Sequence, residues 1–227
     1  MRKTRIIMPL LLALMLVACK FTTNTELYVS DLELLAAGKV ETVPANISVA
    51  VEMPSSTKCQ EMSREVTSLL GEYFSKVKFD KCASEGFNDY LMVRGQLPVV
   101  SIDKAKTLLE RDKGFLFFLV GQGGSMAEVT PYIDKERYGQ FRDLVDQRYS
   151  VAIESGDLEM YIVLRNDSKG ERKIQVCSAY VDRAPIPLCG SITLSGREHA
   201  NVQVSKIQTE YLVKKGLTDY PIITINK

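Results

Sequence analysis

The residue types needed for nucleophilic and acid–base catalysis are scarce in this chain of 227 residues. His199 is its only histidine, which excludes metal sites built on several histidines and leaves one candidate base for a Ser-His-Asp or Cys-His arrangement. It lies between Glu198 and Ala200 in a turn-rich stretch, which favours a solvated surface histidine. No serine stands in the G-x-S-x-G pattern of a nucleophile elbow. The sequence therefore predicts a protein that is not an enzyme, with no catalytic residue and no cofactor.

A glycine-rich run is the one pattern that suggests phosphate chemistry. Gly121–Ser125 follows a strongly apolar stretch, and backbone N–H groups in such a run can bind phosphate. The Lys-Ser/Thr pair of a P-loop is absent, and Met126 stands where a dinucleotide fingerprint needs its last glycine. The favoured interpretation is a flexible connection between strands, with a lid or partner-binding loop as the alternative.

Carboxylates come close together at two places in the sequence. Glu154, Asp157 and Glu159 surround a Ser-Gly turn, and Asp143 and Asp146 lie in a predicted helix. Acid–base catalysis would require one carboxyl group of a pair to be desolvated and its pKa shifted. The turn favours solvated charges, with weak cation binding as the alternative, and no metal site is predicted.

The first eighteen residues have the charge and length of an export signal. Arg2, Lys3 and Arg5 are positive, and the thirteen residues Ile6–Ala18 carry no charge. A helix of that length spans about 20 Å, whereas a membrane-spanning helix needs about 20 residues. Residues 1–18 are therefore predicted to be a signal peptide rather than a membrane span.

The end of this segment, Leu16-Val17-Ala18-Cys19, resembles the lipobox of bacterial lipoproteins. The resemblance implies that diacylglycerol alkylates the Cys19 thiol, that the signal is cut before Cys19, and that an acyl chain such as palmitate modifies the new α-amine. Each buried CH₂ contributes about 0.8 kcal/mol, so two or three chains would anchor the protein firmly to a membrane. An ordinary secretory signal followed by a chance cysteine is the alternative. Lys20 is not the aspartate that retains Gram-negative lipoproteins in the inner membrane, so the expected location is the cell envelope, with the outer membrane as default.

The cysteines that follow are predicted to form two disulfides. Cys59, Cys82, Cys177 and Cys189 would meet an oxidising compartment after export, and four cysteines allow three pairings. The pairs Cys59–Cys82 and Cys177–Cys189 are predicted because each lies within one local unit. For the first pair, a helix from Cys59 to Lys76 travels about 26 Å and an extended return to Cys82 covers about 20 Å, which leaves roughly a disulfide's Cα separation. Zinc ligation is disfavoured because no C-x₂₋₄-C pair is present.

Net charge and chain length restrict the class of protein and the number of domains. The chain has 29 basic and 28 acidic side chains, a net charge of +1, and loss of residues 1–18 removes three basic groups to leave a charge of −2. This balance argues against a nucleic-acid binder. The part after residue 18 is long enough for one large or two small domains. Its longest apolar run, Phe115–Val120, fits a buried strand and is too short to span a membrane.

The first part of the chain alternates between helical and strand patterns. Residues 19–29 are predicted to be a lipidated tether, and residues 30–149 an α/β domain with two main helices on a small sheet. The two helices are expected at 58–76 and 133–148, and a short third one begins with a capping box at Ser30 and ends at Gly38. Strands are expected at 47–53, 77–82, 90–100 and 115–120, and residues 103–111 fit neither pattern clearly.

The pattern changes after about residue 150. Six short strand-like runs separated by turns lie at 151–154, 158–166, 173–181, 191–194, 201–205 and 222–225. They predict an antiparallel β-sandwich over residues 150–227. The strand rhythm resembles that of small immunoglobulin-like modules of exported bacterial proteins, although Cys177 and Cys189 are too close for the inter-sheet bridge of antibody domains. The predicted fold class is therefore α+β, an α/β domain followed by an immunoglobulin-like sandwich.

These features favour a non-enzymatic binding or assembly module of the cell envelope. Its predicted partners are a membrane, through the lipid on Cys19, and an envelope protein, with no nucleic acid. One alternative is an exclusion lipoprotein of the kind carried by phages and plasmids, which blocks a receptor or a channel. The other alternative is an envelope hydrolase, although the sequence offers no site for it.

Overall fold

The computed structural model describes residues 20–124 and 126–226, so the predicted signal peptide and lipid-attachment residue Cys19 lie outside the described residues. The described chain is mainly β, with eleven strands and five short α-helices. The strands are β1 (Phe21–Tyr28), β2 (Thr42–Met53), β3 (Ser75–Glu85), β4 (Asn88–Ser101), β5 (Leu116–Gly123), β6 (Met126–Ile133), β7 (Leu158–Arg165), β8 (Arg172–Val181), β9 (Ala184–Leu194), β10 (His199–Val204) and β11 (Ile223–Asn226). The helices are α1 (Val29–Ala36), α2 (Ser56–Leu70), α3 (Ala105–Arg111), α4 (Lys135–Tyr149) and α5 (Lys206–Lys215).

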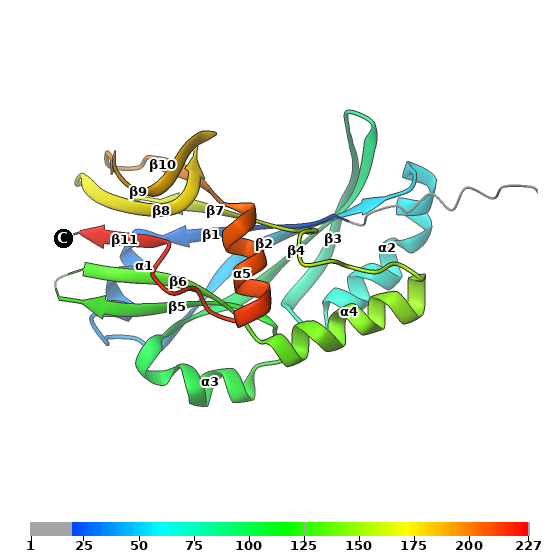
Figure 1. Ribbon diagram of the computed structural model, residues 1–227, viewed down its shortest axis with the longest axis horizontal. Coiled ribbons are helices and arrows are strands. Elements are labelled where there is room, and N and C mark those ends of the chain that lie inside the picture. Colours follow the sequence, from blue (N-terminus) through cyan, green and yellow to red (C-terminus); the bar gives the residue numbers. More distant parts are fainter. Residues whose placement is uncertain (1–19, 125, 227) are drawn as a thin grey trace, which may run out of the picture.

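Nine of the strands close into a mixed β-barrel (Figure 1). Their order is β10-β7-β1-β2-β4-β5-β6-β11-β8, and β8 pairs back to β10 to complete the ring. Strands β3 and β9 lie outside the ring, β3 beside β4 and β9 beside β8. Most neighbours are antiparallel, but β1 pairs with β7 and β4 pairs with β5 in parallel. Closure removes the exposed edges that the ring strands would otherwise present.

The predicted fold class was wrong in both parts. Strands from before and after residue 150 belong to one ring and join at two places, where β7 pairs with β1 and β11 pairs with β6. One large hydrophobic core includes residues from Phe21 to Ile225, and a second, small cluster contains Val100, Ala105 and Leu119. No immunoglobulin-like sandwich forms from residues 150–226, because two of the six strand pairings of this part, β7–β1 and β11–β6, are made with strands of the first part. The physical reason is that alternation shows which side chains of a strand face inward but not which strand it pairs with.

The predicted tether at residues 19–29 is also wrong where the structure describes it. Phe21–Tyr28 form β1, a central barrel strand that is antiparallel to β2 and parallel to β7. Its inward side chains alternate, and Phe21, Thr23, Thr25 and Leu27 are all buried. The two threonines make the segment look polar, and the Thr23 hydroxyl donates to the carbonyl oxygen of Glu159 at 3.4 Å.

The two main predicted helices are present, but several elements around them differ from the prediction. The helix expected at 58–76 is α2, which begins after Ser55, whose hydroxyl accepts a hydrogen bond from the Lys58 backbone N–H. The helix expected at 133–148 is α4, which begins after Asp134, a side chain that caps two backbone N–H groups. Strand β6 and helix α5 were missed, and no strand forms at residues 151–154. Within the described residues no helix is both long and apolar enough to cross a membrane.

Candidate binding cavity

An apolar cavity of about 700 Å³ opens between α2, α4 and one end of the barrel. Strands β1 and β2 supply one wall, and the chain that leads from α4 to β7 supplies another. The side chains that define the cavity are Val51, Met62, Val66, Leu69, Phe141 and Val145. All of them except the half-buried Met62 are buried. The volume lies within the range of about 300–1,000 Å³ that is usual for small-molecule sites.

The spacing of apolar residues on the two helices explains their orientation. On α2, Cys59, Met62, Val66 and Leu69 follow one another at three- or four-residue steps, so they share one face of the helix. On α4, Tyr138, Phe141, Val145 and Tyr149 do the same. Three residues from each of these faces line the cavity, namely Met62, Val66 and Leu69 of α2 and Phe141, Val145 and Tyr149 of α4.

Two rings that line the cavity, those of Phe21 and Phe141, belong to a larger aromatic cluster. The ring of Phe141 lies 5.1 Å from that of Phe115, 5.2 Å from that of Tyr73 and 5.5 Å from that of Phe21, measured between centroids. Tilted and edge-on contacts at these distances are favourable beyond the burial of area alone. The part of the cavity wall formed by Phe21 and Phe141 is therefore supported by closely packed rings.

The charged side chains that line the cavity are exposed or half-buried. Lys58 Nζ lies 2.6 Å from Glu61 Oε2, and both side chains are more than half exposed. Asp157 Oδ2 accepts a hydrogen bond of 2.7 Å from the backbone N–H of Glu154. Burial raises the pKa of Tyr149 to about 12, and the negative charge of Glu65 acts in the same direction. The Tyr149 phenol is therefore neutral at physiological pH, and its hydroxyl oxygen is buried.

The first described residue, Lys20, is fixed at the rim of the cavity. Its carbonyl oxygen accepts a hydrogen bond of 3.0 Å from the backbone N–H of Glu52, a residue that lines the cavity. The backbone N–H of Phe21 donates to the carbonyl oxygen of Asp157 at 2.9 Å. Lys20 is therefore held beside residues that line the cavity.

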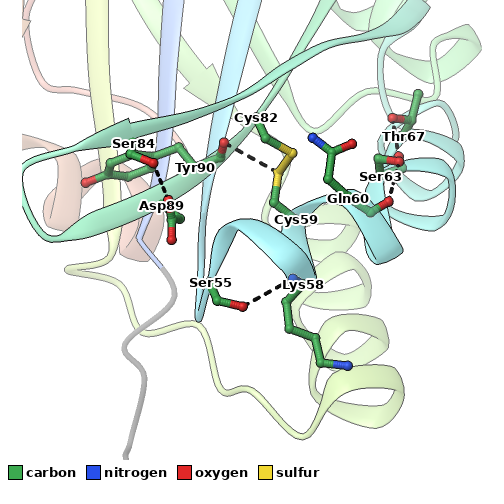
Figure 2. Close-up of a disulfide and its surroundings, with 10 residues drawn as sticks. All are labelled: Ser55, Lys58, Cys59, Gln60, Ser63, Thr67, Cys82, Ser84, Asp89 and Tyr90. Atoms are coloured by element: carbon green, nitrogen blue, oxygen red, sulfur yellow. Dashed lines mark hydrogen bonds between the residues drawn. A yellow bond between two sulfur atoms is a disulfide. The ribbon is translucent and has the colours of Figure 1, made fainter.

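A disulfide between Cys59 and Cys82 joins the cavity wall to the sheet (Figure 2). Cys59 is fully buried in the first turns of α2, and Cys82 lies on β3, with 6.0 Å between the two Cα atoms. The carbonyl oxygen of Tyr90, on the neighbouring strand β4, lies 3.6 Å from Cys59 Sγ. The second disulfide joins Cys177 and Cys189, which lie opposite each other on β8 and β9. Both pairs are those expected from the sequence.

The other residues singled out in the sequence do not come together into a site. His199 is exposed at the start of β10, where it lies opposite Arg165 of β7. Gly121–Gly123 end β5 and Gly124 is in the turn to β6, which agrees with a connection between strands. Asp143 and Asp146 are exposed on α4. In the part of the chain that the structure describes, no group of three or more His, Cys, Asp or Glu side chains could hold a metal ion.

Comparison with known proteins places the chain in a family. A family model described as "Domain of unknown function (DUF7424)" matches residues 21–227. The chain belongs to this family. The match begins at Phe21, the first residue of β1, so the family domain includes the strand that the sequence patterns missed.

The remaining comparisons add little to this assignment. No curated protein matches the chain. Among solved structures, the NMR structure of the folded domain of LppM from Mycobacterium tuberculosis is similar, with a TM-score of 0.28 and 11% identity over 83% of this chain and 90% of that chain. A TM-score at this level carries no argument about fold or function.

Proposed function

We propose that this protein is a lipid-anchored binding protein of the cell envelope that holds an acyl chain or a similar apolar ligand and catalyses no reaction. The observation that carries the proposal is the cavity of about 700 Å³, whose lining is mostly apolar and whose charged residues are exposed or half-buried. Such a cavity favours a ligand with an apolar body and a polar end.

The cavity has the energetics of a site for a chain-like ligand. Each methylene group that moves from water into an apolar environment contributes about 0.8 kcal/mol. Ordering the ligand and losing its overall motion oppose binding by several kcal/mol, so a chain of several buried methylenes is needed before binding becomes measurable. The packed aromatic rings and the disulfide that joins α2 to β3 restrict the motion of the cavity wall. Less conformational entropy is therefore lost when a ligand binds.

The proposed anchor supplies both the location and the source of ligand. A diacylglycerol group on Cys19 would hold the protein in a membrane of the envelope, with the outer membrane as the default because Lys20 follows. Lys20 is hydrogen-bonded at the cavity rim, so the mouth would lie close to the bilayer from which acyl chains come. The exposed position of His199 and the rim-bound carboxylates support a binding role rather than a hydrolytic one.

Displacement of a fluorescent fatty acid from the purified full-length protein tests this proposal. Val66→Phe places a larger side chain into the cavity, so it should weaken binding of the probe at least tenfold, a change of about 1.4 kcal/mol. Ser68→Phe makes the same addition on the exposed face of the same helix and should leave the affinity unchanged. Absence of saturable binding to the wild-type protein, or equal binding by both variants, would refute the proposal.

A further inference from the structure

The structure carries an inference about how the barrel meets its membrane. We infer that Phe87, at the tip of the β3–β4 hairpin, inserts into the bilayer that holds the Cys19 lipid, so that the protein contacts the membrane at two separate points. This inference rests on the lipid anchor of the proposed function but does not depend on what the cavity binds.

The tip of the hairpin carries an apolar side chain that the fold does not need. The turn consists of Gly86 and Phe87 between the paired residues Glu85 and Asn88. Gly86 has φ +63°, which suits the first position of a type II′ turn and explains the glycine. The second position usually carries a polar residue, and Phe87 is fully exposed, with a relative accessibility of 108%. The fully exposed ring of Phe87 is therefore available to contact another surface.

The register of the sheet places this tip at the end of the barrel where β1 begins. Phe21 lies opposite Val51, and Val51 lies opposite Leu91. Because β1 and β4 are each antiparallel to β2, both begin at the same end of the sheet. Phe87 is four residues beyond Leu91 toward that end, about 13 Å at 3.3 Å per residue.

A lipid on Cys19 would be attached near this end of the sheet. Cys19 is two residues before Phe21, and two residues of extended chain span at most about 7 Å. The thioether and glycerol extend this reach further, so the acyl chains and Phe87 can enter the same surface. Figure 1 shows the β3–β4 hairpin projecting away from the body of the barrel.

The hairpin is braced well enough to present its tip. The hydroxyl of Ser84 donates to the carboxylate of Asp89 across the two strands (Figure 2). Arg94 of β4 forms an ion pair of 3.0 Å with Asp80 of β3. The disulfide from Cys82 to α2 fixes the base of the hairpin. These contacts hold β3 and β4 together up to the turn.

A single phenylalanine would bind a bilayer only weakly by itself. Joined to an anchor on the same molecule, it acts at the high effective concentration that a short link provides. Glu85 beside the turn is exposed and acidic, so a zwitterionic surface suits this tip better than an anionic one. The proposed occupant is therefore an electrically neutral phospholipid bilayer.

Tryptophan fluorescence tests the inference directly because the chain contains no tryptophan. Phe87→Trp would introduce the single reporter, and Ile102→Trp would serve as a matched control. Ile102 follows the other end of β4 and is 49% exposed, so both variants place an accessible indole at opposite ends of one strand. The lipidated full-length variants would be reconstituted into phosphatidylcholine vesicles with and without brominated acyl chains.

Insertion predicts that the Phe87→Trp emission moves to shorter wavelength and loses intensity in brominated vesicles, while Ile102→Trp emission does neither. Unshifted and unquenched Phe87→Trp emission on lipidated protein would overturn the inference, and so would equal quenching of both variants. Mass spectrometry of the N-terminal peptide reports the anchor, and its absence would overturn both this inference and the anchoring part of the proposed function. Fatty-acid binding by the same preparations is measured separately, so a failure of cavity binding alone remains distinguishable.

Discussion

Removing the Cys59–Cys82 disulfide should weaken both the fold and the cavity. The bridge closes a sequence separation of 23 residues, and the chain-entropy model assigns such a loop about 3.4 kcal/mol at 25 °C. Cys59 is fully buried, so replacing both cysteines by alanine also leaves a small void beside α2. The double variant should therefore lose about 3–5 kcal/mol of unfolding free energy. Because α2 forms one wall of the cavity, its affinity for a fluorescent fatty acid should fall as well.

The second disulfide provides a matched control. Cys177 and Cys189 close a separation of 12 residues, for which the same model gives about 2.8 kcal/mol. They lie on β8 and β9, and neither residue lines the cavity. The Cys177→Ala/Cys189→Ala variant should lose comparable stability and keep the affinity of the wild-type protein.

Two measurements on each variant separate the two effects. Urea unfolding followed by circular dichroism gives the stability, and displacement of the fatty-acid probe without denaturant gives the affinity. An unchanged unfolding midpoint for the Cys59→Ala/Cys82→Ala variant would refute the stability argument. An equal loss of affinity in both double variants would show that the cavity responds to general loosening rather than to the α2–β3 link.

Three further predictions test the barrel and its charges. Phe21→Ala should lower the unfolding free energy measured in urea by about 3–5 kcal/mol, because the ring is 2% exposed in β1. A near-neutral effect would contradict the packing of β1 into the barrel and favour the tether that the sequence predicted. Gly139→Ala should raise the unfolding free energy by about 0.8–1 kcal/mol, since a Cβ there meets nothing within 4 Å on α4, and a destabilised variant would contradict this. At Glu26, burial alone would raise the pKa, but the hydrogen bond and charge of Arg165 outweigh it and hold the pKa below 4.5. The stability from this depressed pKa is present above pH 4.5 and lost as the pH falls through the folded-state value. Arg165→Gln should therefore cost less than about 1 kcal/mol at neutral pH for this partly exposed pair and nothing in strong acid, and a loss independent of pH would exclude the charge as its cause.

Strands with strongly apolar inward positions could be recognised from the sequence. In β7, Leu158, Met160, Ile162 and Leu164 alternate with half-buried neighbours, and the observed burial follows that alternation. The apolar stripe of α2 was visible for the same reason. Both cysteine pairs could be chosen because each closes a local unit whose length is limited by helix and strand geometry.

The missed elements carry inward residues that do not look like core residues. In β1 the inward-facing Thr23 and Thr25 are completely buried. The sequence alone does not distinguish a buried threonine from an exposed one. In β6 the inward positions include Ala127 and Pro131, and proline within a run argues against a central strand. Here Pro131 sits opposite Phe118 of β5 all the same. Tertiary packing therefore overrides local preference in both strands.

The cavity and the closed ring depend on contacts that no local pattern contains. The pairing of β1 with β7 joins residues such as Phe21 and Leu158, which lie far apart in the chain. Ring closure depends on three pairs between β8 and β10, for example Val181 with Val202. The cavity is a volume left between two recognisable helices, and periodicity shows which face of a helix is apolar but not how completely that face is filled.

The position of β1 changes what a lipid on Cys19 would mean for this protein. A tether of eleven residues, as the sequence suggested, would let the folded part move freely above the membrane. With β1 beginning at Phe21 and the Lys20 carbonyl bonded to Glu52, one residue separates the proposed anchor from the barrel. The orientation of the barrel is then restricted by covalent geometry before any surface contact is made. The cavity mouth and the exposed Phe87, at the end of the sheet where β1 begins, would therefore face the bilayer together. Anchoring, ligand access and hairpin insertion are for this reason best tested on the lipidated protein.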